Sequence, residues 1–304
     1  MMTNFISLLD FSSDQLSMLL DRAVADKAVW RTGKLPHTLE GKTLAMIFEK
    51  PSLRTRVSFE TAMNDLGGHA IHLTQAEIGI ASREAVQDIA RVLGRLCDGI
   101  MARTFSHQFV ETMGRYADVP VVNALTDFSH PCQAMADVMT LRERFGDLVG
   151  RTITFVGDGN NVARSLSVAC HKLGMNFILA CPRGYELQDP FLAGFGPSYR
   201  VEHDPKLAVR TADCVYTDTW VSMGQEEEKE KRRRDFTGYQ LNMDLMAHAP
   251  RHAIILHCLP AYRGFEITDE ALEAHFENIL DEAENRLHFQ RTLLNVLMAE
   301  GGIP

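Results

Sequence analysis

Short, nearly continuous apolar runs recur along this sequence and alternate with stretches of helical hydrophobic spacing. In the second half, the runs span residues 152–156, 177–180, 214–217 and 254–257. In the first half, similar runs span residues 42–48, 69–73, 99–103 and 119–123. Such runs are typical of parallel strands buried on both faces, and intervening helices complete βαβ units. The pattern therefore predicts an α/β fold with two doubly wound parallel-sheet domains.

The boundary between these domains is predicted near Gly150, where the periodic pattern loosens. A chain of 304 residues with 45% hydrophobic residues is long enough to build two cores. We therefore expect one domain over residues 1–150 and a second over residues 151–284. The last helix, from about residue 285, is predicted to pack back on the first domain with the rest of segment 285–304.

Composition excludes several classes of function. A net charge of −9 argues against binding to nucleic acid or to an anionic membrane surface. Six cysteines without a C-x-x-C pair fit a reducing compartment and argue against a disulfide framework or a zinc site. No apolar run reaches membrane-spanning length, and no signal pattern stands at the start. We expect a cytoplasmic globular protein without metal or cofactor.

The segment F-E-K-P-S-L-R-T-R-V-S-F-E, residues 48–60, places a helix N-terminus directly after a strand. Ser52 and Thr55 stand where an N-cap is expected. The free N–H groups of such a terminus, together with Arg54 and Arg56, predict a site for a small doubly charged anion. An ordinary cap with two surface arginines remains the alternative. No G-x-x-x-x-G-K-[ST] loop is present, so nothing indicates ATP.

Two further polar features follow strands of the first domain. Arg103 closes the run G-I-M-A-R, although a charged strand end is often only solvated. In His130-Pro131-Cys132-Gln133, proline at the first helical position puts His130 and Gln133 one turn apart. Their imidazole and amide groups could reach a ligand oxygen. A capping histidine is the alternative interpretation.

The turn G-D-G-N-N, residues 157–161, follows a strand of the second domain. It resembles the start of a dinucleotide fingerprint, but Val162 occupies the position of the last glycine. A nicotinamide-dependent oxidoreductase would also need an acid after the next strand, which instead continues into Cys181 and Pro182. The asparagines offer neutral donors and acceptors suited to the carboxylate or amine of an amino acid.

Two more strand ends carry Asp218, followed by Ser222-Met223-Gly224, and His257-Cys258-Leu259-Pro260. An acid and a thiol at neighbouring strand tips could hold an ammonium group, whereas a turn aspartate and a structural cysteine are the alternative. The charged run E-E-E-K-E-K-R-R-R-D, residues 226–235, is most simply a solvated helix face and secondarily a mobile lid.

Taken together, these motifs resemble the aspartate/ornithine carbamoyltransferase family, in order and nearly from end to end. They are S-x-R-T-R at 52–56, Arg103, H-P-x-Q at 130–133, G-D-G-N-N at 157–161, D-x-x-x-S-M-G at 218–224, H-C-L-P at 257–260 and E-A-E-N-R at 282–286. D-x-x-x-S-M-G with H-C-L-P looks like the ornithine branch.

The resemblance implies a carbamoyl phosphate-binding first domain, an ornithine-binding second domain and an active site in the cleft between them. The implied carbamoyl phosphate ligands are Ser52, Leu53, Arg54, Thr55, Arg103, His130, Gln133, Cys258, Leu259 and Arg286. The implied ornithine ligands are Asn161, Asp218, Ser222 and Met223. The implied catalytic residues are Arg54, Arg103, His130, Asp218 and Cys258.

The implied reaction transfers a carbamoyl group from carbamoyl phosphate to the δ-amine of L-ornithine, giving L-citrulline and phosphate in homotrimers or assemblies of trimers. A carbamoyltransferase for putrescine or acetylornithine, and a non-catalytic amino-acid-binding protein, are the alternatives. The sequence leaves open the direction of the reaction and the group that takes the proton. Leu53, Ala261 and Gly79 depart from the commoner family pattern. Gly79 puts a contact across subunits in doubt.

Overall fold

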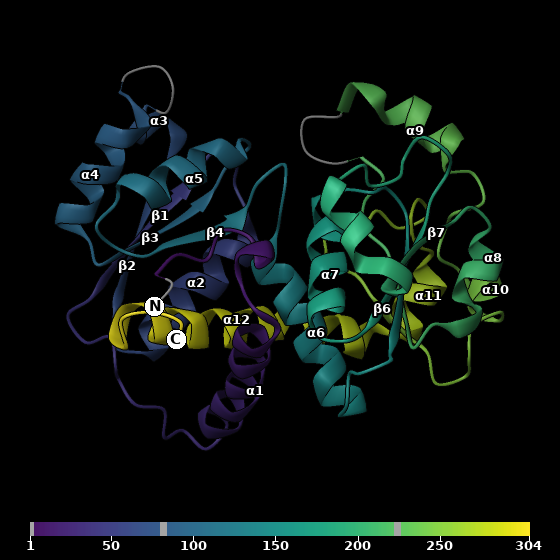
Figure 1. Cartoon of the computed structure of the whole chain (residues 1–304), viewed down its shortest axis with the longest axis horizontal. Helices are drawn as coiled ribbons and strands as arrows, with labels where there is room; N and C mark the ends of the chain where they lie inside the picture. Colours follow the sequence, from purple (N-terminus) through teal and green to yellow (C-terminus); the bar gives the residue numbers. More distant parts are fainter. Residues whose placement is uncertain (1–2, 80–83, 222–225) are drawn as a thin grey trace. The chain divides into compact units, whose positions relative to one another are not determined.

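The computed structural model describes residues 3–79, 84–221 and 226–304 (Figure 1). The chain divides into two compact units. Unit 1 contains residues 1–139 and 285–304, and unit 2 contains residues 140–284. The polypeptide passes from unit 1 to unit 2 within one helix, and it returns within another.

Unit 1 is built on a parallel sheet with the strand order β2-β1-β3-β4. Its strands are β1 (Thr43–Phe48), β2 (His69–Thr74), β3 (Gly99–Arg103) and β4 (Val121–Leu125). Its helices are η1 (Leu8–Asp10), α1 (Ser13–Trp30), α2 (Leu53–Asp65), α3 (Gln75–Ile78), α4 (Val86–Leu96), α5 (His107–Tyr116) and the first part of α6 (Pro131–Phe145). All four predicted strands of this half are confirmed, with ends shifted by up to two residues.

The strand–turn–helix unit β1–α2 is fixed by local chemistry. Burial of Leu44 to Phe48 commits β1 to the core, and Ser52 then caps α2 by accepting the N–H of Thr55. The helix ends at Asp65, Leu66 is its C-cap, and the following Gly67 adopts a φ of 77°. The predicted helix N-terminus directly after a strand is therefore confirmed, although α2 begins at Leu53 rather than at Arg56.

The C-terminal segment belongs to unit 1. Helix α12 (Phe276–Leu294) begins well before the predicted start at residue 285 and continues into the π-helical turn η5 (Asn295–Ala299). Lys27 of α1, which is 2% exposed, donates to Asn285 Oδ1 over 2.7 Å. Asp26 accepts from the Thr292 hydroxyl in the same pair of helices. These bonds hold the C-terminal half of α12 against α1.

Unit 2 contains a second parallel sheet, with the strand order β7-β6-β5-β8-β9. Its strands are β5 (Thr152–Val156), β6 (Asn176–Ala180), β7 (Tyr199–Glu202), β8 (Cys214–Tyr216) and β9 (Ile254–Leu256). Its other elements are α7 (Asn161–Lys172), η2 (Pro190–Ser198), α8 (Pro205–Ala208), η3 (Val209–Thr211), η4 (Glu226–Glu228), α9 (Lys229–Asp235), α10 (Met243–Met246) and α11 (Asp269–Ala274). The edge strand β7 was not predicted.

The sheet order determines which loops meet. Strands β8 and β9 are neighbours, and β5 pairs with β8 on its other side. Parallel strands bring the loops at their carboxyl ends to one edge of the sheet. The loops after β5, β8 and β9 therefore meet there, and the prediction that Asp218 and Cys258 follow neighbouring strands is confirmed. Within the described residues, no helix is both long and apolar enough to cross a membrane.

Candidate active site

The first cluster of predicted site residues lies at the N-terminus of α2 in unit 1. Thr55 is fully buried, and its hydroxyl accepts from Arg286 Nη2 over 2.9 Å and from Arg103 Nη1 over 3.4 Å. The Ser52 hydroxyl lies 3.0 Å from the same oxygen. Two guanidinium groups from β3 and α12 therefore converge on the positive end of α2. We call Ser52, Thr55, Arg103, His130 and Arg286 the cation cluster.

His130 joins this cluster from the start of α6. Burial lowers the pKa of its imidazole well below the usual range, and the positive charges of Arg286 and Arg103 lower it further. The imidazole is therefore neutral at physiological pH. Burial also raises the pKa of the Cys132 thiol to about 12, although nearby Arg286 opposes the shift. Cys132 is thus a neutral core residue, and His130 is a neutral hydrogen-bonding group among cations.

The remaining predicted residues of unit 1 differ in their placement. Arg54 lies half-buried in the first turn of α2. The side chain of Leu53 is 73% exposed and apolar, so only its backbone N–H could bind an anion. Gln133 is buried and donates to Asp137 over 2.7 Å. The expectation that Arg56 adds a cation to the anion site is wrong. Arg56 points outward and pairs with Glu60 one turn later at 2.9 Å.

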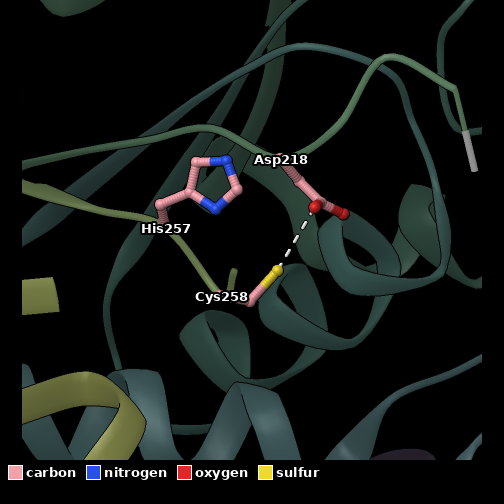
Figure 2. Close-up of side chains that lie close together, drawn as sticks. All are labelled: Asp218, His257 and Cys258. Atoms are coloured by element: carbon pink, nitrogen blue, oxygen red, sulfur yellow. Dashed lines mark hydrogen bonds between the residues drawn. The ribbon is translucent and has the colours of Figure 1, made fainter. Parts of the chain in front are cut away.

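The second cluster lies in unit 2, at the tips of β8 and β9 (Figure 2). The thiol of Cys258 points at the carboxylate of Asp218, with Sγ 3.2 Å from Oδ1. The other carboxylate oxygen accepts from Asn160 Nδ2 over 2.8 Å. Asp218 is 8% exposed, so both of its oxygens are aimed by protein donors in a largely dry environment. We call Asp218, Cys258 and Asn160 the acid–thiol cluster.

His257 supports the loop that carries Cys258. Its N–H donates to Glu282 Oε2 over 2.8 Å, and its Nδ1 accepts the N–H of Leu259 over 2.9 Å. Because Nδ1 is an acceptor, the ring proton lies on Nε2, 3.1 Å from Glu266 Oε1. Glu282 also accepts from the Tyr216 hydroxyl over 3.1 Å. These buried contacts fix the direction of the H-C-L-P loop.

The same view bears on metal binding. A carboxylate oxygen of Asp218, a ring nitrogen of His257 and the Cys258 sulfur all lie within 4.8 Å of one another (Figure 2). Carboxylate, imidazole and thiolate together are ligands that zinc accepts. Both nitrogens of His257, however, are engaged by Leu259 and Glu266. The imidazole serves the loop, and a cation would have to displace one of these bonds.

The turn between β5 and α7 explains why the dinucleotide interpretation fails. A Cβ on Gly159 would lie 2.6 Å from the Tyr185 carbonyl oxygen and 2.8 Å from the Leu187 nitrogen. The chain's own backbone therefore fills the space that a fingerprint glycine leaves for a pyrophosphate. Asn160 caps α7 by accepting from two backbone N–H groups, and Asn161 occupies the first helical position, half-buried.

Comparison with known proteins identifies the family of this chain. The family model for the carbamoyl-P binding domain of aspartate/ornithine carbamoyltransferases matches residues 3–143, and the model for the Asp/Orn binding domain matches residues 149–297. The anabolic ornithine carbamoyltransferase of Pyrococcus furiosus is 47% identical over 99% of this chain and 97% of its own length. The chain belongs to the aspartate/ornithine carbamoyltransferase family.

Solved structures from the family share the fold over almost the entire chain. The ornithine carbamoyltransferase of Pyrococcus furiosus matches with a TM-score of 0.93 at 46% identity, covering 98% of this chain and 97% of that one. The enzyme of Thermus thermophilus matches with a TM-score of 0.89 at 43% identity, covering 98% and 99%. Both are described as ornithine carbamoyltransferases.

Some residues that shape the site were not predicted from the sequence. Ser222 and Met223 fall outside the described residues. Asn160 was passed over in favour of its neighbour, although its capping position was a usable signal. The expectation that residues 226–235 form a solvated helix face is wrong at one position. Arg232 is 6% exposed and binds Asp158, which lies 74 residues earlier in the chain.

Proposed function

We propose that this protein transfers the carbamoyl group of carbamoyl phosphate to the δ-amine of L-ornithine, giving L-citrulline and phosphate. One observation carries the proposal. In a chain of the carbamoyltransferase family, two buried or half-buried arginines converge on the N-terminus of α2, while an aspartate and a cysteine meet at the tips of β8 and β9. The first arrangement suits a phosphate, and the second suits an amine.

Phosphate is held by the start of α2. Ser52, Leu53, Arg54 and Thr55 offer backbone N–H groups, hydroxyls and one guanidinium at the positive end of the helix dipole. Arg103 and Arg286 approach the same point from other elements. Guanidinium groups bind phosphate oxygens through paired, charge-assisted hydrogen bonds. The cluster therefore stabilises the leaving group as its negative charge grows.

The carbamoyl group is held by neutral and charged donors together. His130 and Gln133 lie one turn apart at the start of α6, and the neutral imidazole can donate one hydrogen bond to the carbonyl oxygen without carrying charge. Arg54, Arg103 and His130 stabilise the negative charge that develops on this oxygen during attack. By family pattern, Cys258 and Leu259 act at the reacting carbon.

Ornithine is held by the acid–thiol cluster and its neighbours. Asp218 binds the α-ammonium group, and Asn161 binds the α-carboxylate from the first turn of α7. Ser222 and Met223, which lie outside the described residues, complete this set by family pattern. An amino acid carries both groups, whereas putrescine keeps an amine at that end but lacks the carboxylate, so the set favours ornithine among amines with the same carbon spacing.

The reaction proceeds by addition and elimination. The lone pair of the neutral δ-amine forms a bond to the carbonyl carbon, and the bond from that carbon to the phosphate oxygen then breaks. Phosphate leaves with the electron pair, and the nitrogen loses a proton. The δ-amine must be neutral first, because a free alkyl amine is mostly protonated near neutral pH. Orientation of the two reactants contributes up to about 7–11 kcal/mol of barrier reduction in ideal cases.

Each half of the sequence binds one of the two substrates in this proposal. Residues 1–150, with the C-terminal segment 285–304, form the carbamoyl phosphate-binding domain, and residues 151–284 form the ornithine-binding domain. The descriptions of the two matching family models support this division. Six free cysteines support a reducing cytoplasm as the place of work.

A homotrimer is the assembly that we propose. Large apolar side chains lie on the surface of unit 1, with Leu53 73% exposed, Val57 51% exposed and Ile71 40% exposed. Leu53 and Val57 stand one turn apart on α2, and Ile71 lies on the edge strand β2. Such side chains support burial against a second copy of the chain. Sedimentation velocity measures the assembly directly, and a monomer at micromolar concentration would contradict it.

The test of the function is a product assay with competing amines. Purified protein is given carbamoyl phosphate with L-ornithine, acetylornithine or L-aspartate, and the carbamoylated product and phosphate are both measured. We expect citrulline and phosphate in equal amounts from ornithine, and only background with the other two. Rapid carbamoylation of aspartate or acetylornithine, with none of ornithine, would refute the proposal and retain only the general transferase activity.

A further inference from the structure

Arg232 is a buried cation in a helix whose other basic residues face solvent. Its side chain is 8% exposed, and Nη1 donates to Asp158 Oδ2 over 2.6 Å. The same Nη1 donates to the carbonyl oxygen of Trp220 over 3.0 Å, and Nε donates to Glu228 over 2.8 Å. The guanidinium face also lies 5.2 Å from the centre of the Tyr185 ring. Burying a cation is costly unless its partners are well aimed.

The neighbours of Arg232 in α9 show that this placement is specific. Lys231, Arg233 and Arg234 are exposed, although they share the same helix and the same charge. Lys231 pairs at the surface with Asp235 over 3.2 Å. A surface pair of this kind contributes little to stability. Arg232 hydrogen-bonds to the turn after β5 and to the segment after β8, whereas Lys229 and Arg233 lie over the ring of Phe265.

The contacts of Arg232 lie on both segments that aim Asp218. Asp158 stands two residues before Asn160, whose amide donates to Asp218 Oδ2. Trp220 stands two residues after Asp218, and its carbonyl oxygen accepts from the guanidinium. Arg232 thus ties the β5–α7 turn to the segment after β8 at the point where the two converge on Asp218.

Arg232 also compensates the negative charge of Asp158. Burial raises the pKa of the Asp158 carboxyl, the charge of Arg232 lowers it, and the charges of Asp218 and Glu228 raise it again. Asp158 and Asp218 therefore repel each other in a poorly hydrated region. A buried carboxylate left without its cation is strongly destabilising or takes up a proton.

We propose that Arg232 is a positioning residue for ornithine binding. It compensates the charge of Asp158 and holds the Trp220 carbonyl, so that the carboxylate of Asp218 stays aimed at the ammonium group of the substrate. Arg232 itself does not touch the reacting atoms. This inference rests on the proposed function and adds to it a residue of α9 that holds the ornithine-binding carboxylate in place through Asp158 and Trp220.

The first test compares two substitutions in α9. Arg232→Gln removes the buried charge, and we expect the KM for ornithine to rise at least about tenfold, which corresponds to about 1.4 kcal/mol. The KM for carbamoyl phosphate should change less than about twofold. The matched control, Arg234→Gln, removes one positive charge from an exposed position of the same helix and should leave both constants unchanged. A loss that falls equally on both substrates would overturn the proposal, because it would indicate general unfolding.

The second test separates charge compensation from packing. Arg232→Lys keeps the charge and should recover part of the affinity for ornithine. Adding Asp158→Asn to Arg232→Gln removes both buried charges, and we expect the double variant to bind ornithine better than Arg232→Gln alone. A double variant as weak as the single variant, or weaker, would overturn the compensating role. If Arg232→Gln alone folds poorly, Arg232→Lys and the double variant are each compared with wild type instead. Neither of these two variants leaves Asp158 as a buried charge without a cation.

The outcomes also distinguish the inference from the function on which it rests. A wild-type protein that makes no citrulline would refute the proposed function. A wild-type protein that makes citrulline, beside an Arg232→Gln variant with an unaltered KM for ornithine, would refute only the role of Arg232.

Discussion

The cation cluster and the acid–thiol cluster carry opposite charge, although both lie at the carboxyl ends of parallel strands. In unit 1, guanidinium groups from β3 and α12 meet at the N-terminus of α2 and make a region rich in positive charge. In unit 2, loops after β5, β8 and β9 bring Asp218, Asn160 and Cys258 together around one carboxylate. Both clusters form where parallel strands end. The charge of each therefore reflects the side chains placed there rather than the fold.

The difference extends to how each cluster is supported. The cation cluster draws on a helix terminus, which supplies donors without any side chain. The acid–thiol cluster depends on side-chain and loop contacts, with Asn160 aiming the acid and His257 bracing the thiol loop. We therefore expect substitutions in unit 1 to affect mainly carbamoyl phosphate, and substitutions in unit 2 to affect mainly ornithine.

The largest expected effect is that of Arg103→Met. Charge-assisted hydrogen bonds contribute about 1.5–3 kcal/mol each, and losing two of them should lower kcat/KM for carbamoyl phosphate by about 10³-fold or more. The matched control is Arg56→Met. Arg56 forms an exposed pair with Glu60, so its loss should change the same constant less than about twofold. Steady-state kinetics decides, and equal losses in the two variants would contradict the assignment of the cation cluster.

Asp218→Asn should produce the next largest effect, on the other substrate. The amide cannot compensate an ammonium group, and we expect kcat/KM for ornithine to fall by about 10²-fold, through both a higher KM and a lower kcat. Binding of carbamoyl phosphate, measured by calorimetry without ornithine, should stay within about twofold of wild type. A loss of carbamoyl phosphate binding instead would remove the division of labour between the clusters.

The sequence was most informative where the chemistry is local. The cap at Ser52 and the strand before it lie within a few residues, so the β1–α2 turn was predicted correctly. Strand β7 was missed because Y-R-V-E is a short edge strand without a continuous apolar run. Arg232 was taken for a surface residue because a run of alternating charges looks the same whether or not one side chain turns inward.

Contacts between residues that are far apart in the chain could not be predicted from the sequence. Arg286 donates to Thr55 from 231 residues further along the chain, and no periodicity relates the two positions. Family resemblance supplied Arg286 as a candidate, whereas the geometry that places it beside α2 came from the structure. Asn160 is an intermediate case, because its role as an N-cap was readable but its contact with Asp218 was not.

Gly159→Ala should destabilise unit 2 and sharpen the contrast in how the clusters are supported. The new Cβ would lie 2.6 Å from a backbone oxygen of Tyr185, and overpacking of this kind costs about 1–3 kcal/mol. Gly194→Ala is the control, since a Cβ at Gly194 meets nothing within 4 Å. Urea unfolding measures both variants. Equal stability of the two would show that the β5–α7 turn is less constrained than its packing indicates.

The smallest expected effect concerns His130 and pH. Its pKa is lowered in the folded protein, so below about pH 6.5 the unfolded chain binds a proton that the native imidazole does not. This contribution to stability is present above that pH and is lost as pH falls below it. The variant His130→Asn should lose correspondingly less stability over the same range. The free energy of unfolding of both proteins is measured with urea at pH 7 and pH 5. If wild type and His130→Asn lose the same amount between these two pH values, His130 becomes protonated in the native state.

The most direct test of the central claim is the ratio of kcat/KM for ornithine to kcat/KM for putrescine in the wild-type protein. Putrescine has the same reactive amine and carbon spacing, but it lacks the α-carboxylate that the proposed site binds. A site built to pair polar groups rejects a substrate without them by roughly 10⁴-fold, whereas one missing methylene in an apolar pocket gives only about 10–200-fold. We predict a preference for ornithine near the larger figure. Comparable constants for the two amines would contradict the assignment of Asp218 and Asn161 to the amino-acid end of the substrate.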